Sequence, residues 1–194
     1  MIIKLIFNVI VFIVSLLILC KASLWDVNWL NYESPIEYEN YKGISLKDFK
    51  GLNRVDNTLD GMKDFAFIVT DIKAFKKENK YHVVSMFYPS RSYTFKKEFE
   101  TDGKLLNHEL YHFHITEYRA RVLRKEIGLK NFDYDRMPDL KRDIYRMENS
   151  MQQLYDNETY HGYVLNQQIF WQRKVDSLLN CLIDFKGTEI NINH

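Results

Sequence analysis

Net charge is almost absent from this chain of 194 residues, because 27 Lys and Arg residues are balanced by 26 Asp and Glu residues. No element concentrates the basic residues, as a nucleic-acid-binding face normally does, so the sequence argues against a nucleic-acid binder. Internal repeats and low-complexity segments are also missing. The length suits one domain, and a hydrophobic content of 46% is ample for its core.

Cysteine is scarce as well, with two copies, Cys20 and Cys181. Cys20 closes an apolar N-terminal run, and Cys181 lies in a late helical pattern. After removal or lipidation of Cys20, Cys181 has no partner, so we expect no intramolecular disulfide in the mature chain. We expect Cys181 to be a small buried hydrophobic residue.

Residues 1–22 have the pattern of an export signal. Lys4 is the only charge in the first 19 residues, and Leu5–Leu19 is almost wholly apolar. A positive start followed by about 15 apolar residues is typical of a signal peptide. The run is short for a transmembrane helix, which needs about 20 residues.

Three fates of this segment follow from its residues. Cleavage after Ala22 would place the small residues Cys20 and Ala22 at the two positions that a signal peptidase reads. Cys20 also stands where a lipoprotein is lipidated, although Leu19 is large for that motif. We place cleavage first, a lipid anchor second and a retained membrane anchor third. Each puts residues 23–194 outside the cytoplasm, in the periplasm, in the cell envelope or secreted.

The most informative motif is His108-Glu109-Leu110-Tyr111-His112, an HExxH sequence. Residues four apart on an α-helix share one face, so His108 and His112 can present two imidazoles to one zinc ion. Glu109 adjoins the first ligand, where it can act as the base toward a zinc-bound water. This pattern is the zinc-binding core of many metallopeptidases.

The surrounding sequence predicts a helix of six to seven turns. Asp102 is a plausible N-cap, and Gly128 is a stop signal after Ile127. An apolar stripe recurs at helical spacing along it: Leu106, Leu110, Phe113, Ala120, Leu123 and Ile127. His114 and Glu117 point away from the histidine pair. We therefore expect His114 to support the site from a distance or to lie at the surface.

The other elements predict an α+β fold, a small zincin-like domain in which an antiparallel sheet precedes three helices. Expected strands are an edge strand in Ile44–Gly51, then Phe65–Ile72, Tyr81–Tyr88 and Ser92–Lys96, with a loop at Lys76–Lys80. The HExxH helix comes first among the helices. The second begins near Pro138 and the third spans Gln167–Asp184. Their inward residues are expected to be Leu140, Ile144, Met147, Met151 and Leu154, then Trp171, Val175, Leu178 and Leu182.

A catalytic zinc site usually needs a third protein ligand. The candidates lie in Tyr155–Gly162, between the second and third helices. We prefer His161, because imidazole suits zinc and the following glycine permits a tight turn. Asp156 and Glu158 are the alternatives, and Asp156 could instead cap the third helix. Tyr160 and Tyr163 could stabilise an oxyanion if they face the metal.

Several segments, in order, resemble a family of bacterial exported proteins described as zinc-dependent proteases and long catalogued as a domain of unknown function. Ser45–Gly51 resembles its W-x-D-F-x-G stretch and His108–Ile115 its HEQxHFDI motif. Glu117–Arg121 resembles E-x-x-A-R, Tyr155–Gly162 resembles YDxxTxHG, and Gln168–Trp171 resembles Q-x-x-W. The likeness spans residues 45–182. It implies an exported zinc peptidase.

The chain departs from that family at three positions. Leu46 stands where the family often has Trp, Leu110 where it has Gln, and His114 where it has Asp. The last two flank the metal ligands. They support an alternative reading, a non-catalytic envelope protein that binds a partner on a zincin-like scaffold. A hydrolase of cell-wall peptide cross-links is a further alternative. The leading expectation is a peptidase that acts on a peptide or protein substrate.

The N-terminal segment can be tested by itself. Fusing residues 1–22 to a reporter that is active only outside the cytoplasm should yield an active reporter, because the apolar run behind Lys4 directs export. Replacing Cys20 with Ser should release the protein from membranes if a lipid anchor holds it. A reporter that stays cytoplasmic contradicts the prediction.

Overall fold

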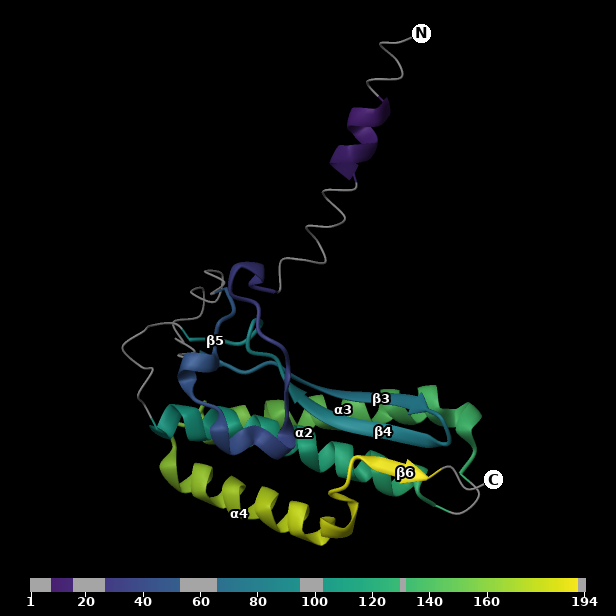
Figure 1. Cartoon of the computed structure of the whole chain (residues 1–194). Helices are drawn as coiled ribbons and strands as arrows, with labels where there is room; N and C mark the ends of the chain where they lie inside the picture. Colours follow the sequence, from purple (N-terminus) through teal and green to yellow (C-terminus); the bar gives the residue numbers. More distant parts are fainter. Residues whose placement is uncertain (1–7, 16–26, 53–65, 95–102, 130–131, 192–194) are drawn as a thin grey trace.

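The computed structural model describes residues 8–15, 27–52, 66–94, 103–129 and 132–191. Within them an antiparallel sheet packs against three long helices (Figure 1). The protein is therefore α+β with an antiparallel sheet, as the sequence predicts.

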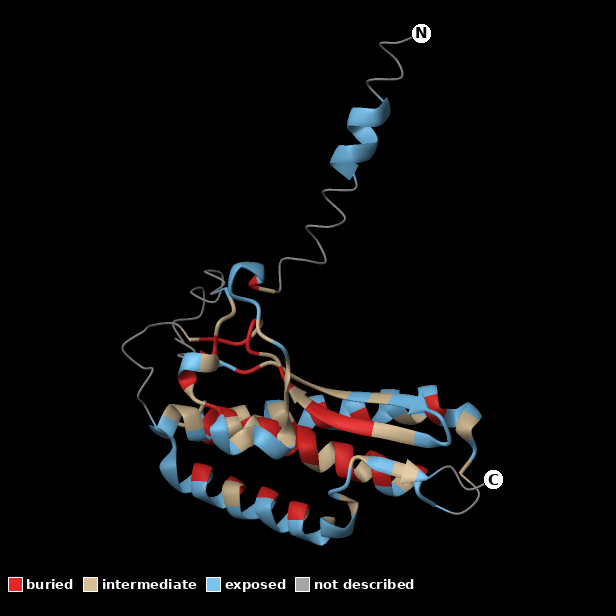
Figure 2. Ribbon diagram, viewed as in Figure 1, coloured by how far each residue is buried: buried red, intermediate tan, exposed pale blue. Residues whose placement is uncertain are grey.

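Most of the predicted export signal, residues 1–7 and 16–22, lies outside the described residues. Residues 8–15 form a short helix whose side chains are exposed (Figure 2). None of the helices in the described part of the chain is both long enough and apolar enough to cross a membrane.

The sheet is centred on β4 (Lys80–Phe87). β3 (Thr70–Lys77) pairs along one edge of β4, and β1 (Ile36–Glu37) and β6 (Glu189–Asn191) pair with opposite ends of the other edge. Because β6 follows the helices, the predicted order of sheet first and helices afterwards is incomplete. The last strand returns to the sheet, where Ile190 packs onto the core beneath β4.

The predicted strand Phe65–Ile72 is divided in the structure. β2 (Ala66–Phe67) pairs with β5 (Tyr93–Thr94), Ile68 and Val69 belong to neither strand, and Thr70–Ile72 begins β3. β3 and β4 also extend into the predicted loop Lys76–Lys80, where they are joined by a tight turn with Glu78 at φ 56°. Long polar side chains are compatible with a strand whose outer edge faces solvent. Of the predicted strand Ser92–Lys96, Tyr93 and Thr94 form β5, Ser92 precedes it, and residues 95–96 lie outside the described residues.

The edge strand predicted within Ile44–Gly51 is wrong. A 3-10 helix, η3 (Leu46–Asp48), occupies this segment. The backbone N–H and the hydroxyl of Ser45 donate to the Asp48 carboxylate at 2.7 and 2.9 Å, which closes a capping box. This local interaction outweighs strand propensity, and Lys50 makes only an isolated bridge to β5. The described residues also contain the 3-10 helices η1 (Trp29–Asn31), η2 (Tyr38–Gly43), η6 (Tyr134–Arg136) and η7 (Ile183–Phe185).

The centre of the fold is α2 (Gly103–Ile127), the predicted motif helix. It contacts β3, β4, α3 (Met137–Thr159) and α4 (Leu165–Cys181). Its 25 residues make about seven turns, and it ends before Gly128 as predicted. Asp102, the predicted N-cap, lies outside the described residues. Since neighbours cover α2 on several sides, it buries polar as well as apolar residues.

The second helix begins as predicted, with Pro138 in its first turn. Its predicted apolar stripe is partly wrong, because Met147 and Leu154 are 50% and 45% exposed. The face toward α2 instead includes Ile144, Glu148, Met151 and Tyr155. Because Glu148 lies within this buried face, the spacing of apolar residues alone does not predict it.

The third helix starts two residues earlier than predicted and ends at Cys181, before η7. Cys181 is exposed, which contradicts its expected burial. The buried face of α4 passes through Gln168, Trp171, Val175 and Leu179. A residue two positions after Leu179 points to the opposite side of a helix.

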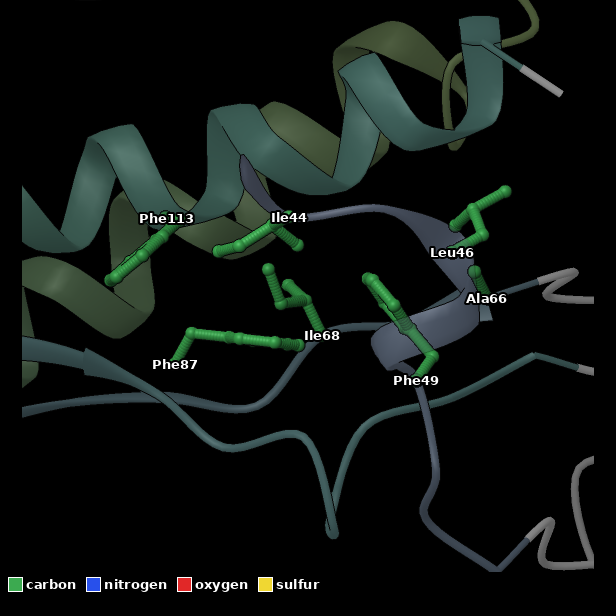
Figure 3. Close-up of a cluster of buried hydrophobic side chains, with 7 residues drawn as sticks. All are labelled: Ile44, Leu46, Phe49, Ala66, Ile68, Phe87 and Phe113. Atoms are coloured by element: carbon green, nitrogen blue, oxygen red, sulfur yellow. The ribbon is translucent and has the colours of Figure 1, made fainter. Parts of the chain in front are cut away.

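Three buried clusters hold these elements together. The cluster in Figure 3 joins the N-terminal segments to α2 and consists of Ile44, Leu46, Phe49, Ala66, Ile68, Phe87 and Phe113. A second lies between the sheet and the helices, and a third, around Trp171 and Tyr155, lies among the three helices. The first cluster brings the segment around Ile68 onto α2 near the HExxH motif.

An ionic cluster fixes α2 to the sheet. The Glu117 carboxylate accepts hydrogen bonds from Arg121 at 2.9 Å, from Arg124 at 2.8 Å and from the Ser85 hydroxyl at 2.7 Å. Arg124 also donates to the backbone oxygen of Val83. Glu117 and Arg124 are almost fully buried, so Glu117 is a structural residue rather than a metal ligand.

Replacing Glu117 with Ala should destabilise the protein by about 3–5 kcal/mol, because two buried guanidinium groups would lose their counter-charge. Urea unfolding followed by circular dichroism measures this. The control is Asp143→Ala, which removes an exposed pair with Arg146 and should cost under about 1 kcal/mol. Equal effects of the two substitutions would contradict the structural role of Glu117.

Candidate metal centre

Three potential metal ligands converge where α2 meets α3. His108 and His112 lie one turn apart on α2, and their Nε2 atoms are 3.4 Å apart. Asp156 reaches them from α3, its Oδ1 lying 3.3 Å from His108 Nε2 and 2.9 Å from His112 Nε2. Together the three residues form a group that could hold a metal ion.

The separations of these atoms can be compared with a zinc site. Zinc bonds of about 2.0–2.1 Å at tetrahedral angles place neighbouring ligand atoms about 3.3–3.4 Å apart. Two of the three observed separations agree, and the third is somewhat shorter. Asp156 Oδ1 is shielded from solvent yet has no hydrogen-bond partner within the described residues. A buried oxygen without a donor, beside two imidazole nitrogens, fits a cation.

The centre belongs to a polar seam between two antiparallel helices. His108 faces Asp156, His112 faces Gln152, and Thr116 faces Glu148. Each step moves four residues forward on α2 and four residues back on α3. Because residues four apart lie on one helix face, a single packing arrangement aligns all three pairs.

The orientation of Gln152 determines which nitrogen of His112 carries the proton. Its amide N–H donates at 3.0 Å to the backbone oxygen of His112, which can only accept. The amide oxygen must then face His112 Nδ1, 2.6 Å away, and accept its proton. In the neutral ring this leaves the lone pair on Nε2, directed toward Asp156.

A second hydrogen-bond relay, a chain that runs through Tyr155 and Gln168, likewise determines which nitrogen of His108 carries the proton. The Tyr155 hydroxyl donates to the backbone oxygen of His108 at 3.2 Å and accepts from the Gln168 amide at 2.5 Å. The Gln168 oxygen therefore faces His108 Nδ1 at 3.0 Å. Both imidazoles are thus held with Nδ1 protonated and Nε2 available to a metal, by amides from α3 and α4.

Electrostatics also favour positive charge at this point. Burial opposes ionisation of Asp156, but His112 and His108 outweigh it and hold the pKa of the carboxyl well below its usual range. Burial lowers the pKa of His112, whereas Asp156 and Glu109 raise it to a net value of about 9. The site therefore favours positive charge beside the Asp156 carboxylate, carried by the His112 imidazolium or by a metal ion in its place.

Glu109 lies beside the three ligands without joining them. Its Oε2 accepts a hydrogen bond of 2.9 Å from the backbone N–H of Ile68, between β2 and β3. Burial raises the pKa of Glu109, and the nearby His112 and His108 oppose that effect. The carboxylate therefore lines the same cavity as the three potential ligands and lies close enough to interact with them electrostatically.

A cavity of about 340 Å³ opens onto this centre. Its walls come from the strand segment 66–70, from α2, from α3 and from the turn after α3. They include Glu109 and the three potential ligands, together with Leu105, Tyr145, Glu148, Asn149, Gln152, Gln153, His161 and Tyr163. The segment Ser92–Lys96 does not contribute to this wall in its described part.

His161, the preferred third ligand, lies next to the group but outside it. Its Nδ1 is 3.6 Å from Asp156 Oδ1, and its side chain lines the cavity. Tyr160, His161 and Gly162 all have positive φ values, of 50°, 53° and 83°. A Cβ on Gly162 would lie 3.1 Å from the His108 ring, so this glycine permits the close approach expected of it.

The other predicted residues are spread around the centre. Glu158 accepts a hydrogen bond of 2.7 Å from the Trp171 indole and so connects α3 to α4. Tyr163 lines the cavity, whereas Tyr160 does not. His114 is buried rather than superficial: its Nδ1 lies 2.8 Å from the Tyr38 hydroxyl, among aromatic rings away from the ligands.

Sequence reasoning missed Gln152, Gln168 and Glu148 at this site. Gln152 and Glu148 lie four and eight residues before Asp156, so helical spacing would have found them once Asp156 was chosen. Gln168 was noticed only as part of the Q-x-x-W likeness. Comparisons add nothing to this geometry, because no protein-family model, curated protein or solved structure matches the chain.

Removing either amide should weaken zinc binding. Gln152→Ala and Gln168→Ala should each lower zinc affinity by about 10–100-fold, because the imidazoles lose the groups that orient them. Competition with a chromogenic chelator measures this. Gln167→Ala, an exposed neighbour, is the control. Unchanged affinity in both variants, with unaltered melting curves, would contradict the relays.

Proposed function

We propose that this protein is an exported zinc metallopeptidase with a zincin-like domain. The observation that carries the proposal is the convergence of His108 Nε2, His112 Nε2 and Asp156 Oδ1 beside the Glu109 carboxylate. Asp156, one of the two alternatives to His161, is the third ligand in this proposal.

A zinc ion bound there would lower the pKa of a water molecule toward about 7 and polarise a peptide carbonyl. Glu109 would take the proton of the attacking water and deliver it to the leaving amine. The Ile68 N–H would hold the carboxylate in place. Tyr163 and His161, at the cavity wall, are the candidates to contact the carbonyl oxygen.

The departures from the family do not disturb the ligands. Leu110 packs against the cluster formed around Ile44 and Phe113, and His114 is held among the aromatic rings of η2. The imidazoles are oriented by amides from α3 and α4 instead. For this reason we prefer the peptidase over a non-catalytic scaffold. Hydrolysis of cell-wall peptide cross-links would use the same residues on a different substrate.

Three substitutions separate metal binding from chemistry. Glu109→Gln should retain about one zinc per chain and lose peptide cleavage by about 10²–10⁴-fold, because it removes the base and no ligand. Asp156→Ala should lose both zinc and cleavage. His161→Ala should retain zinc. Elemental analysis and a fluorogenic peptide screen measure the two properties.

Two outcomes would contradict these roles. Loss of zinc in Glu109→Gln would make Glu109 a ligand, and loss of zinc in His161→Ala with retention in Asp156→Ala would restore His161 as the third ligand. Wild-type protein that stays metal-free when refolded with zinc would remove the peptidase proposal altogether.

A further inference from the structure

The cavity contains a buried carboxylate that the proposed chemistry does not use. Glu148 lines it from α3 and is 5% exposed. Its Oε1 accepts a hydrogen bond of 2.6 Å from the Thr116 hydroxyl. Within the described residues, no Lys or Arg lies within 4.0 Å of it; Arg119 acts on it only through space, with its guanidinium over the Tyr118 ring. Burial raises the pKa of this carboxyl, and hydrogen bonds from Thr116 and Gln152 oppose that effect. A buried carboxylate without a counter-ion is costly unless something else compensates it.

Apart from the imidazoles of the metal centre, the ionisable side chains described on the cavity wall are all acids. Its described charged residues are the acids Glu109, Glu148 and Asp156, with the imidazoles of His108, His112 and His161, and no Lys or Arg. In the proposed function Glu109 is the base and Asp156 is a metal ligand. Glu148 is therefore the acid left for a substrate.

The position of Glu148 suits a side chain next to the scissile bond. It lies one helical turn, about 6 Å along α3, beyond Gln152, the residue that contacts His112. Phe67, Val69 and Tyr145 also line the cavity. Their apolar surfaces suit the methylene stem of a long cationic side chain, whose head would then reach the carboxylate.

We propose that Glu148 forms a specificity subsite for a lysine or arginine side chain close to the scissile bond. This subsite deepens the proposed function and depends on it, because only a peptidase has a scissile bond. The binding of a cationic side chain in this cavity needs no catalysis. A purely structural role, as acceptor of the Thr116 hydroxyl, would be retained by a glutamine, because its amide oxygen also accepts. Glu148→Gln therefore separates the two roles.

Binding is measured by calorimetry on zinc-loaded full-length protein carrying Glu109→Gln, which prevents turnover. The probes are N-acetylated, C-amidated peptides that differ only in having Lys, Arg, norleucine or Glu at one position, scanned along the peptide. At one position Lys or Arg should bind about tenfold to hundredfold more tightly than norleucine, and Glu should bind least. Adding Glu148→Gln should remove this preference.

Two further variants control the result. Asp143→Asn alters an exposed acid of α3 outside the cavity and should keep the preference. Thr116→Val removes the hydrogen bond but keeps the carboxylate, so it too should keep the preference. If Glu148→Gln melts at a lower temperature, the Thr116→Val protein shows whether the loss of that hydrogen bond explains the change in binding.

Equal binding of the Lys, Arg and norleucine peptides, or a preference that survives Glu148→Gln, would overturn the subsite. The same peptides are also tested with a free N-terminus. If only these bind preferentially, the site recognises a terminal amine, and the side-chain assignment is overturned. Cleavage of the norleucine peptides by wild-type protein is scored separately. Cleavage without preference leaves the peptidase proposal intact, and preference without cleavage leaves the subsite intact.

Discussion

The antiparallel packing of α2 against α3 is the constraint on which the candidate centre depends. It places positions 108, 112 and 116 opposite positions 156, 152 and 148, each pair in side-chain contact. A shift of α3 by one residue would rotate its polar face by about 100° and separate all three pairs. The ligand, the orienting amide and the cavity carboxylate would then be lost together.

Such a polar seam is unfavourable unless its groups are satisfied, because buried polar groups without partners cost free energy. The amides of Gln152 and Gln168 meet this need through relays that end on backbone oxygens of α2. The same relays leave Nε2 of both imidazoles without a proton in the neutral rings. Asp156 Oδ1 is the exception among these groups, because it has no hydrogen-bond partner within the described residues. A bound metal ion would provide that partner.

The sequence predicted α2 and its histidine pair well, because the spacing within one helix is local information. It did not predict which residue of Tyr155–Gly162 approaches that pair. The chemical preference for imidazole favoured His161, whereas the register between α2 and α3 brings Asp156 closer. Met147 and Cys181 were misplaced for a related reason, since the buried faces of α3 and α4 include the polar residues Glu148 and Gln168.

X-ray absorption at the zinc edge, recorded on the full-length protein and on its Asp156→Ala variant, tests the central claim most directly. The account predicts two imidazole nitrogens at about 2.0–2.1 Å and oxygen ligands that include a carboxylate, with loss of bound zinc in the variant. A third imidazole in the wild-type spectrum, or zinc bound in the same way without Asp156, would contradict it.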